Sequence, residues 1–130
     1  MQVHRHAASL GLAFWAFSAP AQTAGQVVLD ELGGLRIDKT EVTIAQFARY
    51  TQATRATTRA EREGGGFEYV GGWQRRAGWT WQRPDGTPPD SDQLPAVHIT
   101  HAEAQAYCQW ANGRLPTAAE WRAAGFTELR

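Results

Sequence analysis

The chain has 130 residues, and its 13 basic and 13 acidic side chains give a formal net charge of zero at pH 7. This length predicts one small domain. The charge balance argues against the basic surface by which proteins bind nucleic acids, so no nucleic-acid partner is expected. Cys108 is the only cysteine. An internal disulfide is therefore excluded, and packing has to stabilise the fold.

The first residues have the pattern of a secretory signal peptide. Arg5 lies in the polar start, residues 10–17 form an apolar run, and Ala19-Pro20-Ala21 is a small-x-small cleavage pattern. We therefore predict a leader over residues 1–21 and an exported domain, periplasmic or secreted, over residues 22–130. The alternative, a buried first helix over residues 10–17, explains the basic start less well. The apolar run is shorter than the roughly 20 residues that span a bilayer, so no membrane association is expected after cleavage.

The first elements after the leader are short strands and a helix. Residues 27–29 and 35–37 are apolar or β-branched runs that predict an opening strand pair or one bent strand. Thr43 and Gln46 have the spacing of a capping box, in which each side chain accepts a hydrogen bond from the other residue's backbone amide. An apolar face with helical spacing follows from Ile44. The sequence therefore predicts a helix that starts at Thr43.

Residues 63–93 are rich in glycine, proline and tryptophan and have no helical period. Residues 67–70 and 73–75 flank Gly71-Gly72, which favours a tight hairpin. Farther along, Trp79 and Trp81 are expected to share one face of a short strand because side chains alternate along a strand. Loop and short strand are therefore predicted for this whole stretch.

Two more helices are predicted by capping boxes at Thr100 with Glu103 and at Thr117 with Glu120. Asn112-Gly113 is typical of a helix end in the left-handed αL conformation, so the first of these helices is expected to end there.

Three further expectations concern the same two helices. Gly125 is expected to end the second one. Helical spacing places Trp110 and Trp121 on apolar faces, so both side chains are expected to be buried. The predicted class is α+β, with short strands, about three helices and much irregular loop.

Four segments in a fixed order carry a resemblance to a known family. They are residues 37–43 (IDKTEVT), 81–86 (WQRPDG), 94–110 (LPAVHIT running into AYCQW) and 114–121 (RLPTAAEW). Together they resemble the formylglycine-generating-enzyme, or sulfatase-modifying factor, family over most of the predicted mature chain. The departures include His101 in place of a usual tryptophan and Arg122 in place of a common glutamate.

This resemblance implies a fold and an activity. The family adopts a variant of the C-type-lectin-like fold, which would be incomplete here because the resemblance covers only the N-terminal portion of the domain. Family enzymes convert a cysteine of client sulfatases to formylglycine with copper and oxygen. The copper-binding cysteine pair and most calcium ligands lie outside the resembling segments. We therefore expect no catalytic or metal-binding residue and no activity from this chain alone, with copper and calcium present only if a missing C-terminal part supplies their ligands.

The residues that invite a catalytic interpretation have plainer explanations. Cys108 lies near the apolar face of a predicted helix, which is typical of an inert packed cysteine. His98 and His101 fall at a strand end and a helix cap rather than on one helical face, and a metal site needs more ligands. Glu103 and Glu120 are accounted for by their capping boxes.

A candidate binding surface comes from Trp79, Trp81 and Arg83, because two tryptophans beside an arginine in an irregular loop suit a peptide or another ligand. At least one of the two tryptophans is expected in the core. Three functions stay open: part of an enzyme domain, a secreted peptide- or ligand-binding module, and a subunit completed by a separate chain. The expected partner is a sulfatase-type client peptide or that complementing chain.

Overall fold

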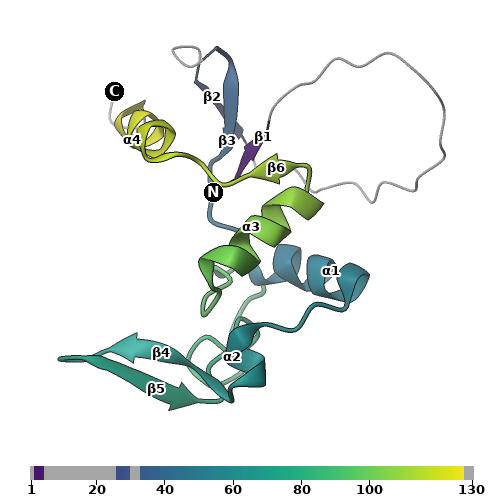
Figure 1. Cartoon of the computed structure of the whole chain (residues 1–130), viewed down its shortest axis with the longest axis vertical. Coiled ribbons are helices and arrows are strands. Elements are labelled where there is room, and N and C mark those ends of the chain that lie inside the picture. The colour runs from purple at the N-terminus through teal and green to yellow at the C-terminus, as the bar shows by residue number, and fades with distance from the viewer. Residues whose placement is uncertain (1, 5–25, 30–32, 128–130) are drawn as a thin grey trace.

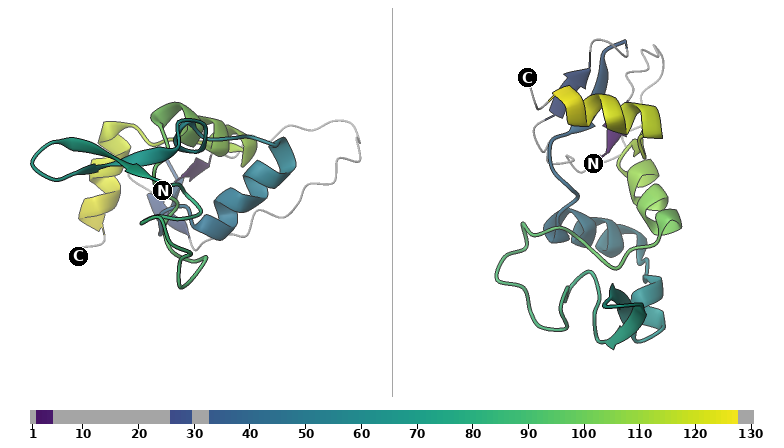
Figure 2. Two further views of the ribbon diagram at one scale, coloured as in Figure 1. Left: turned by 90° about the horizontal axis from the view of Figure 1, so that it is seen from below. Right: turned by 90° about the vertical axis from the view of Figure 1, so that its left-hand side faces the viewer.

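The computed structural model describes residues 2–4, 26–29 and 33–127. Most of the predicted leader lies outside these residues, and its cleavage stays a prediction. The chain forms a mixed α+β fold, as predicted. Its sheet and the last helix lie at one end, a separate hairpin lies at the other end, and two helices lie between them (Figures 1 and 2). No helix in the described ranges has the length and apolar character needed to cross a bilayer.

The larger sheet has four strands in the order β2-β3-β1-β6, and its neighbouring strands are antiparallel. The predicted strand pair is confirmed, with Val28 opposite Arg36. The inner strand β1 was not predicted, because its two residues belong to the leader pattern. The bounds are β1 (Val3–His4), β2 (Gln26–Leu29), β3 (Leu35–Asp38) and β6 (Gly113–Arg114).

The helices begin where the capping boxes predict. In each predicted box the threonine hydroxyl accepts from the third backbone amide, and the glutamine or glutamate side chain accepts from the threonine amide. A fourth box, Thr58 with Glu61, starts a short helix that the sequence analysis did not predict. The helices are α1 (Ile44–Thr54), α2 (Arg59–Arg62), α3 (His101–Trp110) and α4 (Ala118–Thr127).

The helix ends agree with the predictions in one case and not in the other. Asn112 has a φ of 61°, so the left-handed exit after α3 is confirmed. The prediction for Gly125 is wrong, because α4 continues through this residue. A glycine lowers helix stability without ending a helix whose neighbouring residues pack well.

The hairpin predicted around Gly71-Gly72 is formed by β4 (Gly65–Tyr69) and β5 (Trp73–Ala77). Tyr69 lies opposite Trp73. The connection has three residues rather than two. Gly71 adopts a φ of 63°, which a residue without a Cβ reaches at little cost.

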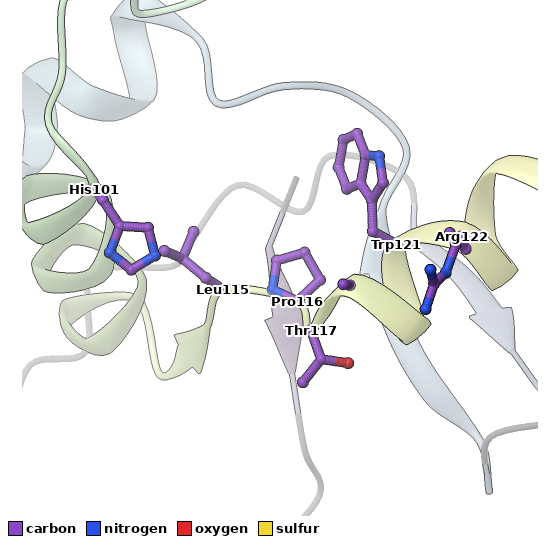
Figure 3. Close-up of a pocket in the computed structure, with 7 residues that line it drawn as sticks. His101, Leu115, Pro116, Thr117, Trp121 and Arg122 are labelled. Carbon is purple, nitrogen blue, oxygen red and sulfur yellow. The ribbon is translucent and has the colours of Figure 1, made fainter.

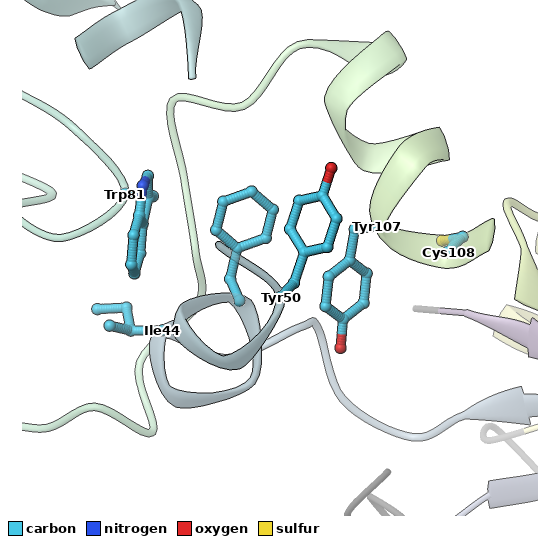
Figure 4. Close-up of a cluster of buried hydrophobic side chains, with 6 residues drawn as sticks. Ile44, Tyr50, Trp81, Tyr107 and Cys108 are labelled. Carbon is cyan, nitrogen blue, oxygen red and sulfur yellow. The ribbon is translucent and has the colours of Figure 1, made fainter. Parts of the chain in front are cut away.

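The main core is a cluster of aromatic rings centred on Phe47 of α1, whose side chain is 1% exposed. Its ring centroid lies 5.3 Å from Tyr50, 5.2 Å from Trp81 and 5.7 Å from Tyr107. These separations are typical of favourable aromatic packing. Because Trp81 comes from the irregular loop and Tyr107 from α3, the cluster joins three parts of the chain (Figure 4).

The expectation that Trp110 and Trp121 are buried is wrong. Trp110 is 37% exposed and covers the edge of the aromatic cluster, with its ring 5.6 Å from Tyr50. Trp121 is 53% exposed. The part of α4 that packs on the sheet carries the small residues Ala123 and Ala124, while Trp121 lines an open groove.

Phe47→Ala is expected to lower the free energy of unfolding by about 3–5 kcal/mol, because it removes a buried ring from the centre of the core. Phe67→Ala is the matched control, since Phe67 is 44% exposed, and its cost should stay within about 1 kcal/mol. Urea unfolding followed by circular dichroism measures both values. Equal costs for the two variants would contradict the assignment of the core.

Candidate functional site

The three residues of the predicted binding surface are not presented together. Trp81 is 3% exposed and lies in the aromatic core, as expected for at least one of the tryptophans, whereas Arg83 is exposed. The prediction that Trp79 and Trp81 share a strand face is wrong. Thr80 and Arg83 exchange backbone hydrogen bonds of 3.0 and 3.1 Å, so this segment is a tight turn rather than an extended strand.

The indole Nε1–H of Trp81 is buried and has no hydrogen-bond partner in the described part of the chain. An indole nitrogen can only donate, so a carbonyl, a carboxylate or water is the partner that it lacks. Leaving such a donor buried and unpaired costs about 1–3 kcal/mol.

His98 holds the hairpin and the irregular loop together. Its Nε2 lies 2.8 Å from the carbonyl oxygen of Pro84, which can only accept, so Nε2 donates. The ring also packs against Trp79 and against Gly66, where a Cβ would collide with the imidazole. His101 lies on α3 instead. Among the described residues no group of three His, Cys, Asp or Glu side chains is placed to hold a metal ion.

Cys108 is 2% exposed and lies within the aromatic core cluster (Figure 4). Burial, as the largest cause, raises the pKa of its thiol. A nucleophilic or metal-binding cysteine needs the thiolate and an accessible sulfur. The surroundings of Cys108 therefore oppose both roles.

An open groove of about 590 Å³ lies between the start of α3 and the start of α4 and is called here the α3–α4 groove (Figure 3). Its lining combines apolar surface with an imidazole, a hydroxyl and a guanidinium. The lining residues are His101, Leu115, Pro116, Thr117, Ala118, Trp121 and Arg122. A wide groove of this composition can accept an extended peptide, since it offers apolar contact and a few polar groups that fix orientation.

A paired Arg114 and Glu120 fix the segment that carries this groove. The two terminal guanidinium nitrogens of Arg114, Nη2 and Nη1, donate to the Glu120 carboxylate at 2.6 and 2.7 Å. Glu120 also accepts from the backbone amide of Thr117 at 2.7 Å. The Arg114 hydrogen bonds, followed by the Thr117 amide, lower the pKa of Glu120 to about 2. The pair thus locks β6, the connection through Thr117, and the first turn of α4 into one geometry.

A family model described as Sulfatase-modifying factor enzyme 1-like domain matches residues 19–127. The chain belongs to this family. The match includes all four segments on which the resemblance depended, so that resemblance is confirmed. Two of the departures from the family pattern, His101 and Arg122, line the α3–α4 groove. They were the signal in the sequence that could have located this groove.

Curated relatives in the family match only part of their own length. A formylglycine-generating enzyme of Streptomyces coelicolor is 34% identical over 122 residues, covering 78% of this chain and 39% of that enzyme. The mouse formylglycine-generating enzyme is 33% identical over 111 residues, or 68% of this chain and 29% of that enzyme. A hercynine oxygenase of Mycolicibacterium thermoresistibile is 36% identical over 92 residues, covering 55% of this chain and 20% of that enzyme. The chain thus spans less than half the length of these relatives.

Glu120→Gln is expected to destabilise the sulfatase-modifying-factor fold by about 1–2 kcal/mol at neutral pH. This is less than the full pKa shift implies, because Arg114 is partly exposed to solvent. The Glu120 pKa is depressed from 4.5 to about 2, so the stabilisation is fully present above about pH 4.5 and is lost as pH falls toward 2. Urea midpoints of wild type and variant should therefore converge in acid. Glu41→Gln, a change at an exposed carboxylate, serves as control.

Proposed function

We propose that this chain supplies the N-terminal, scaffold-forming portion of a formylglycine-generating domain. The complete domain would oxidise a cysteine of a client sulfatase to formylglycine. The observation that carries the proposal is the family match over residues 19–127, together with partial matches to two formylglycine-generating enzymes. The proposed fold is the family's variant of the C-type-lectin-like fold. The described helices and short strands are compatible with it.

We propose that the residues responsible for the oxidation chemistry lie outside the described part of the chain. Copper(I) prefers soft thiolate ligands, so a converging cysteine pair would hold the ion, and the bound copper would supply the oxidation chemistry. Cys108 does not fit that role, because it is a single thiol, buried and with a raised pKa. No step of the reaction is therefore assigned to this chain's residues. We propose that copper and calcium join the domain only through ligands that lie elsewhere.

The proposed location is the periplasm or the exterior of the cell, and the basis for it is the leader pattern of residues 1–21. The proposed partners are a sulfatase-type client or a chain that completes the domain. Trp79 and Arg83 stay candidates for ligand contact, since Trp79 is half-buried and Arg83 exposed. Trp81 offers almost no surface to a ligand.

The α3–α4 groove supports a second candidate function, a binding module for extended peptides. Arg122 places a cation where the family pattern commonly has glutamate, and it lies beside the exposed ring of Trp121. A cation at this position disfavours a basic peptide side chain and favours an acidic one. Apolar contact with Trp121 and Leu115 would supply most of the affinity, while Arg122 would select the charge.

The scaffold proposal predicts that the 130-residue chain binds copper(I) weakly and forms no aldehyde in a Cys-x-Pro-x-Arg peptide. Anaerobic copper(I) titration against a competing chelator and mass spectrometry of the peptide measure the two results. Cys108→Ser should change neither, because the buried thiol takes no part. Stoichiometric tight copper, lost in Cys108→Ser and accompanied by aldehyde formation, would contradict the proposal.

The binding-module candidate predicts a charge preference in the α3–α4 groove. A labelled Cys-x-Pro-x-Glu peptide should bind more tightly than Cys-x-Pro-x-Arg, and Arg122→Glu should reverse the order. The expected effect is up to about fivefold, as for an exposed ion pair. Fluorescence anisotropy measures both affinities, and Arg36→Glu controls for net charge because Arg36 is exposed on β3. An order that Arg122→Glu leaves unchanged would contradict charge selection by Arg122 in this groove.

A further inference from the structure

The β4–β5 hairpin projects from the rest of the molecule and exposes apolar side chains at its outer end. Its base lies beside α2, whereas the connection between its strands points away from the helices (Figures 1 and 2). Trp73 is 73% exposed and Tyr69 is 66% exposed, more than any other large hydrophobic side chain in the described part of the chain. Phe67 and Val70 are exposed as well. These four side chains are called here the hairpin tip.

The fold does not depend on the hairpin tip. Neither core cluster in the described part of the chain includes a residue of the tip. The hairpin is instead held at its base, where the Gly66 amide donates to the Trp79 carbonyl at 2.7 Å and Arg75 donates to the Glu63 carboxylate at 2.6 Å. Large apolar side chains that are exposed together and bordered by charged groups mark a surface for a partner. The tip is therefore a candidate binding surface.

The register of the hairpin places the aromatic rings on one face. Tyr69 lies opposite Trp73, and Phe67 lies opposite Arg75. Members of the two pairs are two residues apart along each strand, so their side chains share a face. The Tyr69 and Trp73 ring centroids are 5.4 Å apart, and the Arg75 guanidinium carbon lies 4.9 Å from the Phe67 ring centroid. The outermost part of this face is therefore aromatic, with a cation immediately behind it.

The hairpin lies within a basic stretch of the chain. Residues 55–83 contain six arginines, three glutamates and no lysine or aspartate, which gives a net charge of +3 at pH 7. The whole chain is neutral, so the remaining residues carry −3. Arg59, Arg75 and Arg76 each contact a glutamate of the stretch, and these contacts leave its excess of three positive charges in place. A second copy is disfavoured as the partner of the tip, because two such stretches would repel each other.

We propose that the hairpin tip inserts into the headgroup region of an anionic lipid bilayer and that the chain thereby binds membranes from one side. Tryptophan and tyrosine favour this region, because each combines an apolar ring with a polar group that stays hydrated. The positive charge of residues 55–83 complements the negative surface potential of anionic lipids. A projecting tip also suits a deformable lipid surface, whereas aromatic hot spots between proteins lie in closely packed pockets.

This mode of binding needs no membrane-spanning helix. The expectation of no membrane association rested on the apolar run of residues 10–17, which is too short to span a bilayer. A tip that enters only the headgroup region binds reversibly, with a strength set by the apolar area that it buries and by its attraction to anionic lipids. The inference is independent of the proposed function, because neither the α3–α4 groove nor Cys108 is part of the tip.

A fluorescent label at the tip tests the proposal on the full chain and separates it from binding through residues 10–17. Val70→Cys carries an environment-sensitive dye, and Arg36→Cys is the control, because Arg36 is exposed on β3 at the other end of the molecule (Figure 1). Cys108 is buried, so the dye reacts with the introduced cysteine in the folded chain. On vesicles of equal parts phosphatidylglycerol and phosphatidylcholine, brominated lipid chains should quench the label at position 70 and leave the label at position 36 unchanged.

Vesicle co-sedimentation of unlabelled chains measures what the tip contributes to the affinity. Trp73→Ala should weaken binding to the anionic vesicles by about fivefold or more, because the ring no longer enters the apolar boundary of the bilayer. Trp121→Ala, which removes an exposed ring outside the tip, should leave the affinity unchanged. High salt or pure phosphatidylcholine should weaken binding of the wild-type chain. Circular dichroism checks that each variant is folded.

Three results would overturn the proposal: a label at position 70 that stays unquenched on vesicles, equal affinities of Trp73→Ala and wild type, or equal binding to neutral and anionic vesicles. Dimerisation without lipid that Trp73→Ala abolishes would assign the tip to a second copy, and it would overturn the proposal as well. Copper and aldehyde assays are independent of these readouts, so failure of the proposed function is distinguishable.

Discussion

The ring of Phe47 is the contact on which the rest of the structure depends. It lies within 5.7 Å of three other aromatic rings, and these rings come from α1, the irregular loop and α3. The start of α1 is also bonded to residues 92–96, through Ile44 to Leu94 and through Val42 to Ala96. Because the loop has little regular structure of its own, these contacts fix its path. They thereby set where α3 begins and where the α3–α4 groove opens.

The two core clusters differ in whether all their residues lie inside the family match. The aromatic cluster is assembled from residues that all lie inside the family match, and Phe47 and Cys108 within it are almost fully buried. The second cluster depends on Val3, which lies outside that match. The sheet therefore relies on β1, whose residues the sequence pattern assigns to the predicted leader.

The sequence predicts what depends on neighbouring residues and fails where distant segments meet. The capping boxes at Thr43, Thr100 and Thr117 were predictable because each depends on two residues three positions apart. Burial of Trp121 was not, since helical spacing identifies a face but not what covers it. The α3–α4 groove was missed because His101 lies far along the chain from Trp121 and their meeting depends on the core. Even so, the departures from the family pattern at two lining positions were visible in the sequence.

Two separate features of the described residues have unmet interactions. Trp81 has a buried donor without an acceptor among the described residues, and Trp121 has a large apolar ring in an open groove. They occur in different elements, the irregular loop and α4. An unpaired buried donor costs about 1–3 kcal/mol, which is a large share of the stability of a small domain. A carbonyl or a water molecule can satisfy the indole within the core, whereas the Trp121 ring becomes buried only when a partner enters the groove.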